Sequence, residues 1–378
     1  MELIVNSALS GVGLSGIRRF TKLAKDTPGS ILLTIGEPDL NTPEPVKQAA
    51  KQALDHNDTH YPEGNGNLYL REAISEFEAR RNGLSYSPEE IILTIGATEA
   101  LFISLFTILN PGDEVLIPTP AFSLYESIVR LCRGVPVALP TEKTDFQLTE
   151  QQLRAAVTPR TKAIVLTTPN NPTGCIYSEE TLEGIHRVLK DLPVFVLCDE
   201  VYRQLVYTDS YRSFSGFFDM RDRIIVIQSF SKPYAMTGWR VGYVMADAPI
   251  RERMQVVHQY DVVSVGAFLQ PACAEALRYD NAAEMAIFRR RRDYVYGRLT
   301  GMGLSVQKPE GAFYMFPSVE QFGMDSLTFC TRMLKESLVA LTPGCYFGTE
   351  GYARISYCYG DDVLREGLDR VERFIGTL

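Results

Sequence analysis

The sequence has few of the residues and patterns that identify several large classes of protein. It holds one tryptophan, four histidines and seven cysteines, and the cysteines are scattered, odd in number and never spaced as Cys-x-x-Cys. This pattern indicates neither a disulfide framework nor a cysteine zinc site, and it is typical of a reduced, cytoplasmic protein. The histidines His56, His60, His186 and His258 are not spaced like the ligands of a metal site. We therefore expect them in the core or on the surface.

Long apolar runs and basic surfaces are also missing. No apolar run approaches the roughly 18 residues that a membrane helix needs, and no signal-peptide core is present. Lysine and arginine number 38 against 46 acidic residues, which gives a net charge of -8 and a pI near 5.3. Nucleic acid and anionic lipid both require a basic surface, so neither is an expected partner. The basic run 289–292 lies inside a helical pattern, and we expect a solvated helix face there, with an anion-binding patch as the alternative.

The chain itself is long enough for about two domains at ~150 residues each, with 378 residues of ordinary globular composition. From about residue 44 to 279, short apolar runs alternate with helix-length amphipathic stretches. The runs are residues 91–95, 114–117, 163–167, 194–198, 224–227 and 241–245. This alternation predicts an α/β fold with a mostly parallel sheet covered by helices on both faces, and a ligand site at the carboxyl ends of the strands.

The pattern changes after Asn281, which predicts a second, smaller lobe. A long helix to about Met302 is followed by strand-like segments at 312–316 and 354–359, with a helix from about Ser326 to Ser337 between them. Such an order is typical of an α+β unit. We therefore predict an N-terminal arm over 1–43, irregular and packed with the small lobe, a large cofactor-binding domain over 44–280, and a small domain over 281–378.

The segment 229–240 has the composition of a cofactor anchor. Lys232 follows Ser229 and Ser231 directly after an apolar run, and Arg240 ends the segment. An amine at a strand end can condense with an aldehyde, while hydroxyls and a fixed guanidinium can hold a phosphate. Pyridoxal phosphate presents both groups. The alternative is a surface lysine in a serine-rich turn.

A carboxylate at the end of another apolar run fits the same cofactor. Asp199 ends the run 193–198, where a buried charge is costly unless it is paired. A protonated pyridine nitrogen is such a partner, and its positive charge makes the ring an electron sink for a carbanion. Tyr202, three positions on, is a candidate hydrogen-bond partner of the ring's phenolate oxygen. For Asp199 the alternative is a helix N-cap.

Two turns carry further candidates for this site. In the turn 169–174 two prolines flank asparagines, which can aim the amide of Asn171 at the phenolate oxygen. Gly96, Ala97 and Thr98 open an apolar helix after a strand, and small residues there let backbone N–H groups approach a phosphate. A plain turn and a structural glycine are the respective alternatives.

Two aromatic residues and one arginine complete the candidates. Phe122 follows the strand 114–117 and can stack on the pyridine face, although a core phenylalanine is the alternative. Tyr61 begins a glycine-rich loop that enters a helix, which is a common setting for a site and also for a plain loop. Arg354 lies within an apolar strand and needs a carboxylate, either that of a substrate or an internal one.

Together these segments resemble the class I/II, fold type I pyridoxal phosphate aminotransferases across essentially the whole chain and in the family's order. The resemblance implies transfer of an amino group between an amino acid and a 2-oxo acid by a ping-pong mechanism. It implies these roles: Lys232 as the Schiff-base lysine, Asp199 on the pyridine nitrogen, Tyr202 and Asn171 on the phenolate oxygen, Gly96, Ala97, Thr98, Ser229, Ser231 and Arg240 around the phosphate, Phe122 stacked on the ring, Arg354 on the α-carboxylate, and Gly36 in a substrate-side loop. It also implies a homodimer in which Tyr61 reaches the phosphate of the neighbouring subunit.

The segments 15–20, 257–260 and 311–314 look like the bacterial aspartate, aromatic and N-acetyl-diaminopimelate branch of this family. For the substrate side chain only Arg18, Arg19 and Tyr260 are candidates. Two other readings remain open at this point. A pyridoxal phosphate C–S β-lyase would use the same anchor. A ligand-sensing regulator module would need a basic winged-helix domain, for which we expect no room before the family pattern begins.

Overall fold

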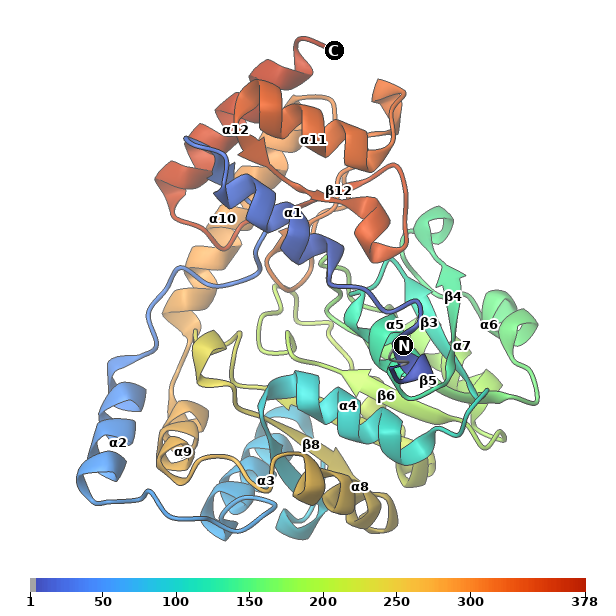
Figure 1. The fold of residues 1–378 in the computed structure, drawn as a ribbon, viewed down its shortest axis with the longest axis vertical. Coiled ribbons are helices and arrows are strands. Elements are labelled where there is room, and N and C mark those ends of the chain that lie inside the picture. The colour runs from blue at the N-terminus through green and yellow to red at the C-terminus, as the bar shows by residue number, and fades with distance from the viewer. Residues whose placement is uncertain (1–4) are drawn as a thin grey trace, which may run out of the picture.

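The computed structural model describes residues 5–378, which fold around three β-sheets (Figure 1). The helices are α1 Gly16–Lys25, α2 Glu44–Asp55, α3 Leu68–Asn82, α4 Gly96–Ile108, α5 Leu124–Leu131, α6 Glu150–Ala156, α7 Glu179–Leu189, α8 Ala248–Asp261, α9 Gln270–Arg278, α10 Ala282–Gly301, α11 Ser326–Ser337 and α12 Asp361–Ile375. The strands are β1 Ile31–Leu32, β2 Ile91–Thr94, β3 Glu114–Thr119, β4 Val135–Pro140, β5 Thr161–Thr167, β6 Phe195–Asp199, β7 Ile224–Ser229, β8 Gly242–Ala246, β9 Tyr314–Met315, β10 Val339–Ala340, β11 Thr342–Pro343 and β12 Ala353–Ser356. Over this part of the chain no helix is long and apolar enough to cross a membrane.

The largest sheet has seven strands in the order β2-β8-β7-β6-β5-β3-β4. Neighbours from β7 to β4 are parallel, and β8 runs antiparallel to both β7 and β2. The α/β class and the mostly parallel sheet are therefore confirmed. The edge strand β4 was not predicted: Pro136 and Pro140 argue against a central strand, and most residues of this edge strand are partly or fully exposed.

Helices bury both faces of this sheet. Successive side chains of a strand point to opposite faces. Ile225 accordingly joins the apolar cluster that packs under α4, α5 and α8, whereas the next residue, Val226, joins the cluster under α3, α7 and α9. Burial on both sides explains why the inner strands appear in the sequence as short uninterrupted apolar runs.

The two small sheets lie together with the C-terminal helices. One has the order β11-β12-β9, and in the other β1 pairs in parallel with β10, with Ile31 opposite Val339. Phe20 and Leu33 from the N-terminal segment belong to the same apolar cluster as residues of α10, α11 and α12. Figure 1 shows this arrangement, with α1 in blue against the elements drawn in orange and red.

The N-terminal segment is more regular than expected. It contains the ten-residue helix α1, which begins after Ser15, whose side chain accepts a hydrogen bond from the backbone N–H of Arg18. The expectation of an irregular arm was wrong here, because the glycines flank this helix instead of interrupting its apolar face. The boundaries at residues 43 and 280 stay a prediction, and residues 1–4 of the arm lie outside the described part.

The run of four arginines on α10 agrees only partly with the expected solvated helix face. Arg289 and Arg290 are exposed, in agreement with a solvated face, but Arg291 and Arg292 are buried. Arg291 forms ion pairs with Asp39 at 2.6 Å and with Asp361 at 3.0 Å. A helix that packs on one side must bury part of any four-residue run, and here two arginines are held by carboxylates or aromatic rings.

Candidate active site

Neighbouring strand ends bring the predicted residues to one edge of the large sheet. In the parallel register Thr167 of β5 lies opposite Asp199 of β6, and Asp199 lies opposite Ile227 of β7. Lys232 follows β7 by three residues. The carboxyl ends of parallel strands meet at one edge, and there a site can be assembled from residues far apart in the sequence.

Lys232 lies partly buried above this edge. Its Nζ donates a hydrogen bond to the carbonyl oxygen of Gly36 at 2.6 Å, which brings the loop of Gly36 into the site. Burial lowers the pKa of Lys232 to about 8, and the positive charges of Arg354 and Arg240 act in the same direction. Much of this amine is therefore neutral at mildly alkaline pH, which is the form that attacks an aldehyde or takes up a proton.

Asp199 is a buried carboxylate that has hydrogen bonds but no cationic partner among the residues that the structure describes. Tyr125 donates to its Oδ2 at 2.6 Å, and Thr167 donates to the hydroxyl of Tyr125 at 2.8 Å. The backbone N–H of Val201 lies 3.4 Å from Oδ1. Burial raises the pKa of Asp199 to about 6, although Tyr125 opposes this shift. A buried carboxylate of this kind gains stability from a positively charged group, and a protonated pyridine nitrogen supplies one.

Arg354 presents a guanidinium without a carboxylate partner among residues 5–378. Arg354 is 3% exposed. Its Nη1 donates a hydrogen bond to Asn171 Oδ1 at 2.7 Å, and its Nη2 donates one to the carbonyl oxygen of Thr34. The rings of Tyr314 and Phe347 lie on it, with centroids 4.5 and 4.8 Å from Cζ. Its Nε has no hydrogen-bond partner in the structure. The alternative of an internal carboxylate is thus not what the structure shows, and a substrate carboxylate fits this group.

The first turn of α4 and Arg240 form a cradle that a phosphate fits. Gly96 has a φ of +71°, and a Cβ added to it would lie 2.7 Å from Nη2 of Arg240. A Cβ on Gly242 would lie 2.9 Å from the backbone nitrogen of Ala97. Gly96 therefore has a backbone conformation that favours glycine and lies against the guanidinium, and Gly242 lets β8 approach the backbone of the first residues of α4. The first N–H groups of a helix lack intrahelical acceptors, so those of Gly96, Ala97 and Thr98 can bind an anion.

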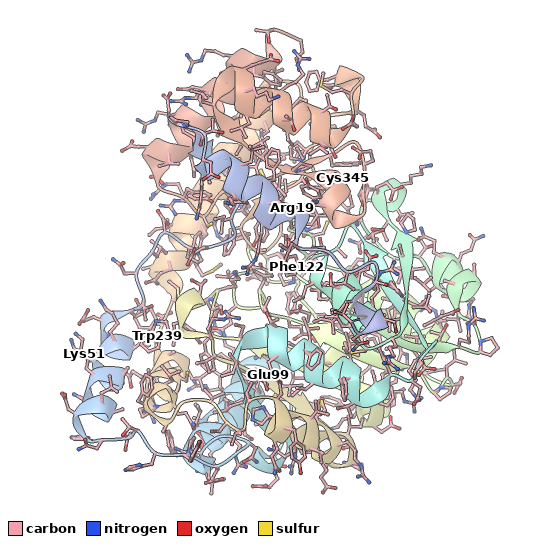
Figure 2. The ribbon with its side chains drawn as sticks, viewed as in Figure 1. Arg19, Lys51, Glu99, Phe122, Trp239 and Cys345 are labelled. Atoms are coloured by element: carbon pink, nitrogen blue, oxygen red, sulfur yellow. The ribbon has the colours of Figure 1, made fainter. Side chains whose placement is uncertain are left out.

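Three more predicted residues lie close to these groups. Ser229 and Ser231 are buried in the turn before Lys232, where the backbone N–H of Ser231 donates to Ser229 Oγ at 3.1 Å. The ring of Phe122 stands edge-on to that of Tyr125, with centroids 6.4 Å apart. Through Tyr125 the ring of Phe122 is adjacent to the carboxylate of Asp199. Figure 2 labels Phe122 in the region between the large sheet and the C-terminal elements.

Tyr202 and Tyr61 are placed differently from one another. The hydroxyl of Tyr202 lies 2.8 Å from that of Tyr314, inside the site. Tyr61 is 90% exposed and makes no hydrogen bond within the described part of its own chain. Arg18, Arg19 and Tyr260 are also exposed. The structure therefore brings most of the predicted residues together. Tyr61, Arg18, Arg19 and Tyr260 are exposed, as are Thr98 and Arg240 of the cradle.

Sequence reasoning missed several groups that complete the site. Tyr125 and Thr167 hold Asp199, and Tyr314 with Phe347 enclose Arg354. A tyrosine in an amphipathic helix or a phenylalanine near the C-terminus looks like an ordinary core residue. Only the three-dimensional neighbours distinguish them, and no local signal in the sequence would have found them.

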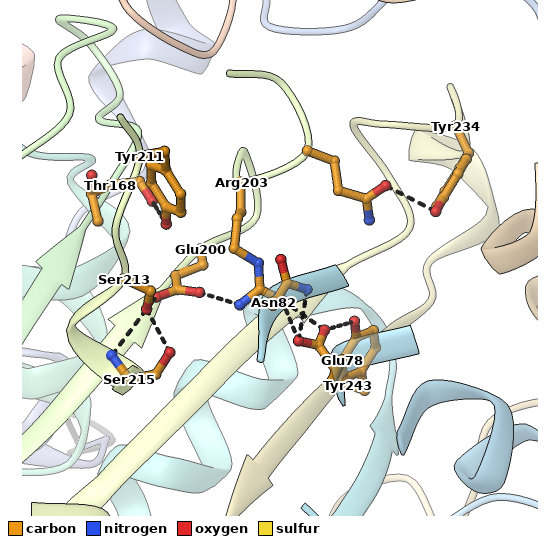
Figure 3. A network of polar contacts seen from close by, with 11 residues as sticks. Glu78, Asn82, Thr168, Glu200, Arg203, Tyr211, Ser213, Ser215, Tyr234 and Tyr243 are labelled. Carbon is orange, nitrogen blue, oxygen red and sulfur yellow. Dashed lines mark hydrogen bonds and ion pairs between the residues drawn. The ribbon is translucent and has the colours of Figure 1, made fainter. Parts of the chain in front are cut away.

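A second polar cluster surrounds Glu200, the residue that follows Asp199 in the sequence (Figure 3). Arg203 donates to Glu200 at 2.5 Å and to both oxygens of Glu78, and Tyr243 donates to Glu78 at 2.6 Å. All of these residues are buried. Glu200, the residue after Asp199, therefore holds a structural position in this cluster.

An amine that attacks aldehydes, set beside a buried carboxylate and a phosphate cradle, is the arrangement of enzymes that use pyridoxal phosphate. Comparison with known proteins gives the family. The chain belongs to the family described as aminotransferase class I and II, whose model matches residues 28–371. Members of this family depend on pyridoxal phosphate, so the protein is an amino-group transferase with that cofactor.

Three relatives show how close the similarity is. A probable N-acetyl-LL-diaminopimelate aminotransferase of Bacillus subtilis is 44% identical, with 99% of this chain and 96% of that protein covered. Aromatic-amino-acid aminotransferase 2 of Thermococcus litoralis is 40% identical over 99% of this chain and 98% of that one. The solved structure of aspartate aminotransferase from Thermus thermophilus with maleate matches with a TM-score of 0.93 at 34% identity, covering 98% and 100% of the two chains.

Proposed function

We propose that Lys232 is the group that binds pyridoxal phosphate covalently and moves the substrate proton in this amino transfer. The observation that carries the proposal is the position of its amine, buried enough to lower its pKa to about 8 and subject to the positive charge of Arg354, whose guanidinium has no carboxylate partner among residues 5–378. A substrate carboxylate bound by Arg354 places the adjacent Cα near Nζ of Lys232. A neutral amine at that point can accept the Cα proton and return it to the cofactor side.

The other predicted residues hold the cofactor. When bound, pyridoxal phosphate supplies an electron sink for the negative charge that develops at Cα. Asp199 pairs with the pyridine nitrogen and keeps it positive, while Tyr125 and Thr167 orient the carboxylate. The remaining contacts are assigned as follows: Tyr202 and Asn171 to the phenolate oxygen, Gly96, Ala97, Thr98, Ser229, Ser231 and Arg240 to the phosphate, Phe122 to the ring face and Gly36 to the substrate side.

For the substrates we propose an α-amino acid of the aspartate, aromatic or N-acetyl-diaminopimelate type and a 2-oxo acid acceptor, with 2-oxoglutarate as the common one. The names of the similar proteins support these three types. The aromatic rings that enclose Arg354 fit an amino acid held by its carboxylate. Arg18, Arg19 and Tyr260 remain our candidates for the side-chain end of the substrate.

We further propose that the protein works as a homodimer in the cytoplasm, with Tyr61 of each subunit reaching the phosphate of the other. The family is typically dimeric. Tyr61 and Tyr260 are 90% and 83% exposed, which is unusual for aromatic side chains unless a partner covers them. The seven cysteines are free, as in proteins of reducing compartments.

The test of this assignment is a Lys232→Ala variant. It should bind pyridoxal phosphate without the visible absorbance of lysine-bound cofactor, and borohydride should fix no cofactor to the chain. Amino transfer from aspartate, phenylalanine or N-acetyl-diaminopimelate should fall by about 10²–10⁴-fold or more, since general acid–base catalysis contributes that much.

Lys162→Ala is the matched control, because Lys162 lies at the start of β5 with its Nζ over the ring of Phe195, remote from the site. It should keep the absorbance and the rate. Full transfer by Lys232→Ala would refute the assignment. Release of pyruvate and a thiol from cystathionine, without amino transfer, would favour a β-lyase instead.

A further inference from the structure

A buried ion pair connects α8 to the helix of the phosphate cradle. His258, on α8, is 0% exposed; its Nδ1 lies 2.6 Å from Oε1 of Glu99 and its Nε2 lies 2.7 Å from the carbonyl oxygen of Gly64. Both partners are hydrogen-bond acceptors, whereas a neutral imidazole has only one N–H. Donation to both acceptors at once requires a proton on each ring nitrogen, so the ring faces Glu99 as a cation.

Glu99 belongs to the first turn of α4, whose free N–H groups form the cradle. Its second oxygen accepts a hydrogen bond from the backbone N–H of Ile95, next to Gly96 (Glu99 is labelled in Figure 2). A carboxylate at the beginning of a helix competes with any other anion bound there. Unbalanced, Glu99 would repel a phosphate at Gly96, and the imidazolium of His258 cancels this charge.

The second N–H of His258 reaches the loop that carries Tyr61. Gly64, whose carbonyl accepts it, lies three residues after Tyr61. A further anchor of this loop is the bond from the N–H of Leu93 to the carbonyl of Asn65 at 3.0 Å. One buried side chain thus fixes both elements that are proposed to hold the phosphate, the first turn of α4 in one subunit and the Tyr61 loop offered to the other.

We propose that His258 is a positioning residue for the cofactor's phosphate: its imidazolium neutralises Glu99 beside the cradle and fixes Gly64 in the Tyr61 loop. This inference rests on the proposed function, because it assumes that the phosphate binds at α4. It assigns His258 no part in the chemistry at Lys232.

The experiment measures anion binding by the apoenzyme. In His258→Gln, the dissociation constant for pyridoxal phosphate should rise about tenfold. The inhibition constant of inorganic phosphate, measured as a competitor of pyridoxal phosphate binding, should rise by the same factor. Both changes are expected because the charge of Glu99 is then left unbalanced at a helix N-terminus. At saturating cofactor the absorbance of lysine-bound cofactor should return to the wild-type value. Loss of that absorbance in the wild-type protein itself would contradict the proposed function, whereas an unchanged phosphate constant in the variant contradicts this inference alone.

Two further variants separate charge balance from general damage to the fold. The double variant His258→Gln/Glu99→Gln removes both charges and should recover most of the lost phosphate affinity. If His258 has only a structural role, the double variant should bind phosphate no more tightly than His258→Gln alone. Glu99→Gln alone keeps the cation and should bind phosphate at least as tightly as wild type; weaker binding overturns the proposal even where His258→Gln does not fold.

The matched control is His186→Gln. His186 also pairs with a carboxylate, Asp219 at 2.7 Å, but it lies on α7, which packs on the opposite face of the sheet from α4. This variant should leave both phosphate constants unchanged. A tenfold loss in it as well would show that the measurement reports general destabilisation, and the proposal would fall.

Discussion

In the proposed function, protonation of a single side chain, Lys232, decides when the site can react with its cofactor. An ammonium cannot attack an aldehyde, and burial lowers the pKa of this group to about 8 from the ordinary 10.5. The amine is therefore protonated and inactive below pH 8 and neutral above it. We expect the rate at which the apoenzyme attaches added pyridoxal phosphate to rise with pH around a midpoint near 8, measured by stopped-flow absorbance.

A variant sharpens this test. Because the positive charge of Arg354 also lowers the pKa of Lys232, Arg354→Gln should shift the midpoint upward. A wild-type midpoint near 10, as in a free lysine, would show that the amine is solvated in the apoenzyme.

Replacement of Asp199 is expected to change the stability of the apoenzyme and its activity in opposite directions. The pKa of Asp199 in the folded protein, about 6, lies above its ordinary value of 3.8, so the folded state binds the proton more tightly than the unfolded chain. The ionised form destabilises the apoenzyme fully above pH 6, and this cost vanishes below pH 3.8. Asp199→Asn should therefore stabilise the apoenzyme at pH 8 by up to about 3 kcal/mol.

The same substitution should lower amino transfer by about 10²–10³-fold, because the pyridine nitrogen loses its charged partner. Urea unfolding of the apoenzyme at pH 8 and pH 4 measures the stability, and the gain should be largely lost at pH 4. Tyr177→Phe is the control, since Tyr177 is buried beyond the turn of Asn171 and makes no hydrogen bond through its hydroxyl in the described chain. An apoenzyme destabilised by Asp199→Asn at pH 8 would contradict the prediction.

The chemistry of single residues was the part most open to sequence reasoning. Lys232 follows an apolar run, Asp199 ends one and Arg240 directly precedes one, and an end of a buried strand restricts what a charged residue there can do. Groups that act through a neighbour were not accessible in the same way. Tyr125 hydrogen-bonds Asp199 across 74 positions of sequence, and such a pairing depends on how α5 packs against β6.

At the scale of elements, the buried cluster of Figure 3 holds the segment from Asp199 to Tyr202 in place. Arg203 joins Glu200, in the same turn, to Glu78 on α3. Burial raises the pKa of Glu200, whereas the charge of Arg203 opposes this. The two carboxylates therefore depend on one guanidinium, and removal of that guanidinium leaves buried charge without a partner.

Arg203→Met should lower the free energy of unfolding by about 3–5 kcal/mol, the usual cost of breaking a buried pair. The triple variant Arg203→Met/Glu78→Gln/Glu200→Gln should recover much of this loss, because no charge then remains buried. Arg130→Ala is the control: its pair with Glu126 is exposed on α5 and should contribute at most about 0.5 kcal/mol. Denaturant unfolding of the three proteins measures all of these values. Equal losses in Arg203→Met and in the triple variant would point to lost packing instead of unpaired charge.

Helices and strands were predicted correctly where a segment has one clear hydrophobic pattern. They were missed where buried and exposed residues are mixed. The buried strands of the large sheet and the helix α11 were found within a few residues of their bounds. Strand β4 is half exposed, and α1 lies between glycine-rich stretches, so neither produced a clear pattern. Arg291 and Arg292 could not be recognised as buried, because their partners Asp39 and Tyr207 lie on distant segments.

At the scale of the whole molecule, the proposed dimer accounts for the exposure of Tyr61. This tyrosine lies in a glycine-rich loop, is 90% exposed and makes no hydrogen bond within residues 5–378 of its own chain. In a twofold dimer the same residue of each subunit meets the same surface of the other. The sequence resemblance implied this arrangement, and no single chain can display it.

Hybrid dimers test whether Tyr61 acts across the subunit boundary. Lys232→Ala and Tyr61→Ala chains, each impaired alone at limiting pyridoxal phosphate, are dissociated, mixed and reassembled. If Tyr61 serves the partner, each hybrid holds one site with both residues intact, and random reassembly should restore about a quarter of the wild-type rate. If Tyr61 serves its own chain, every site in the hybrid is defective and mixing restores nothing. A mixture of Lys232→Ala with His186→Gln chains should keep about half of the wild-type rate however the chains pair, which controls for activity lost during dissociation and reassembly. A mixed sample of the first two variants no faster than its components would show that Tyr61 does not reach across.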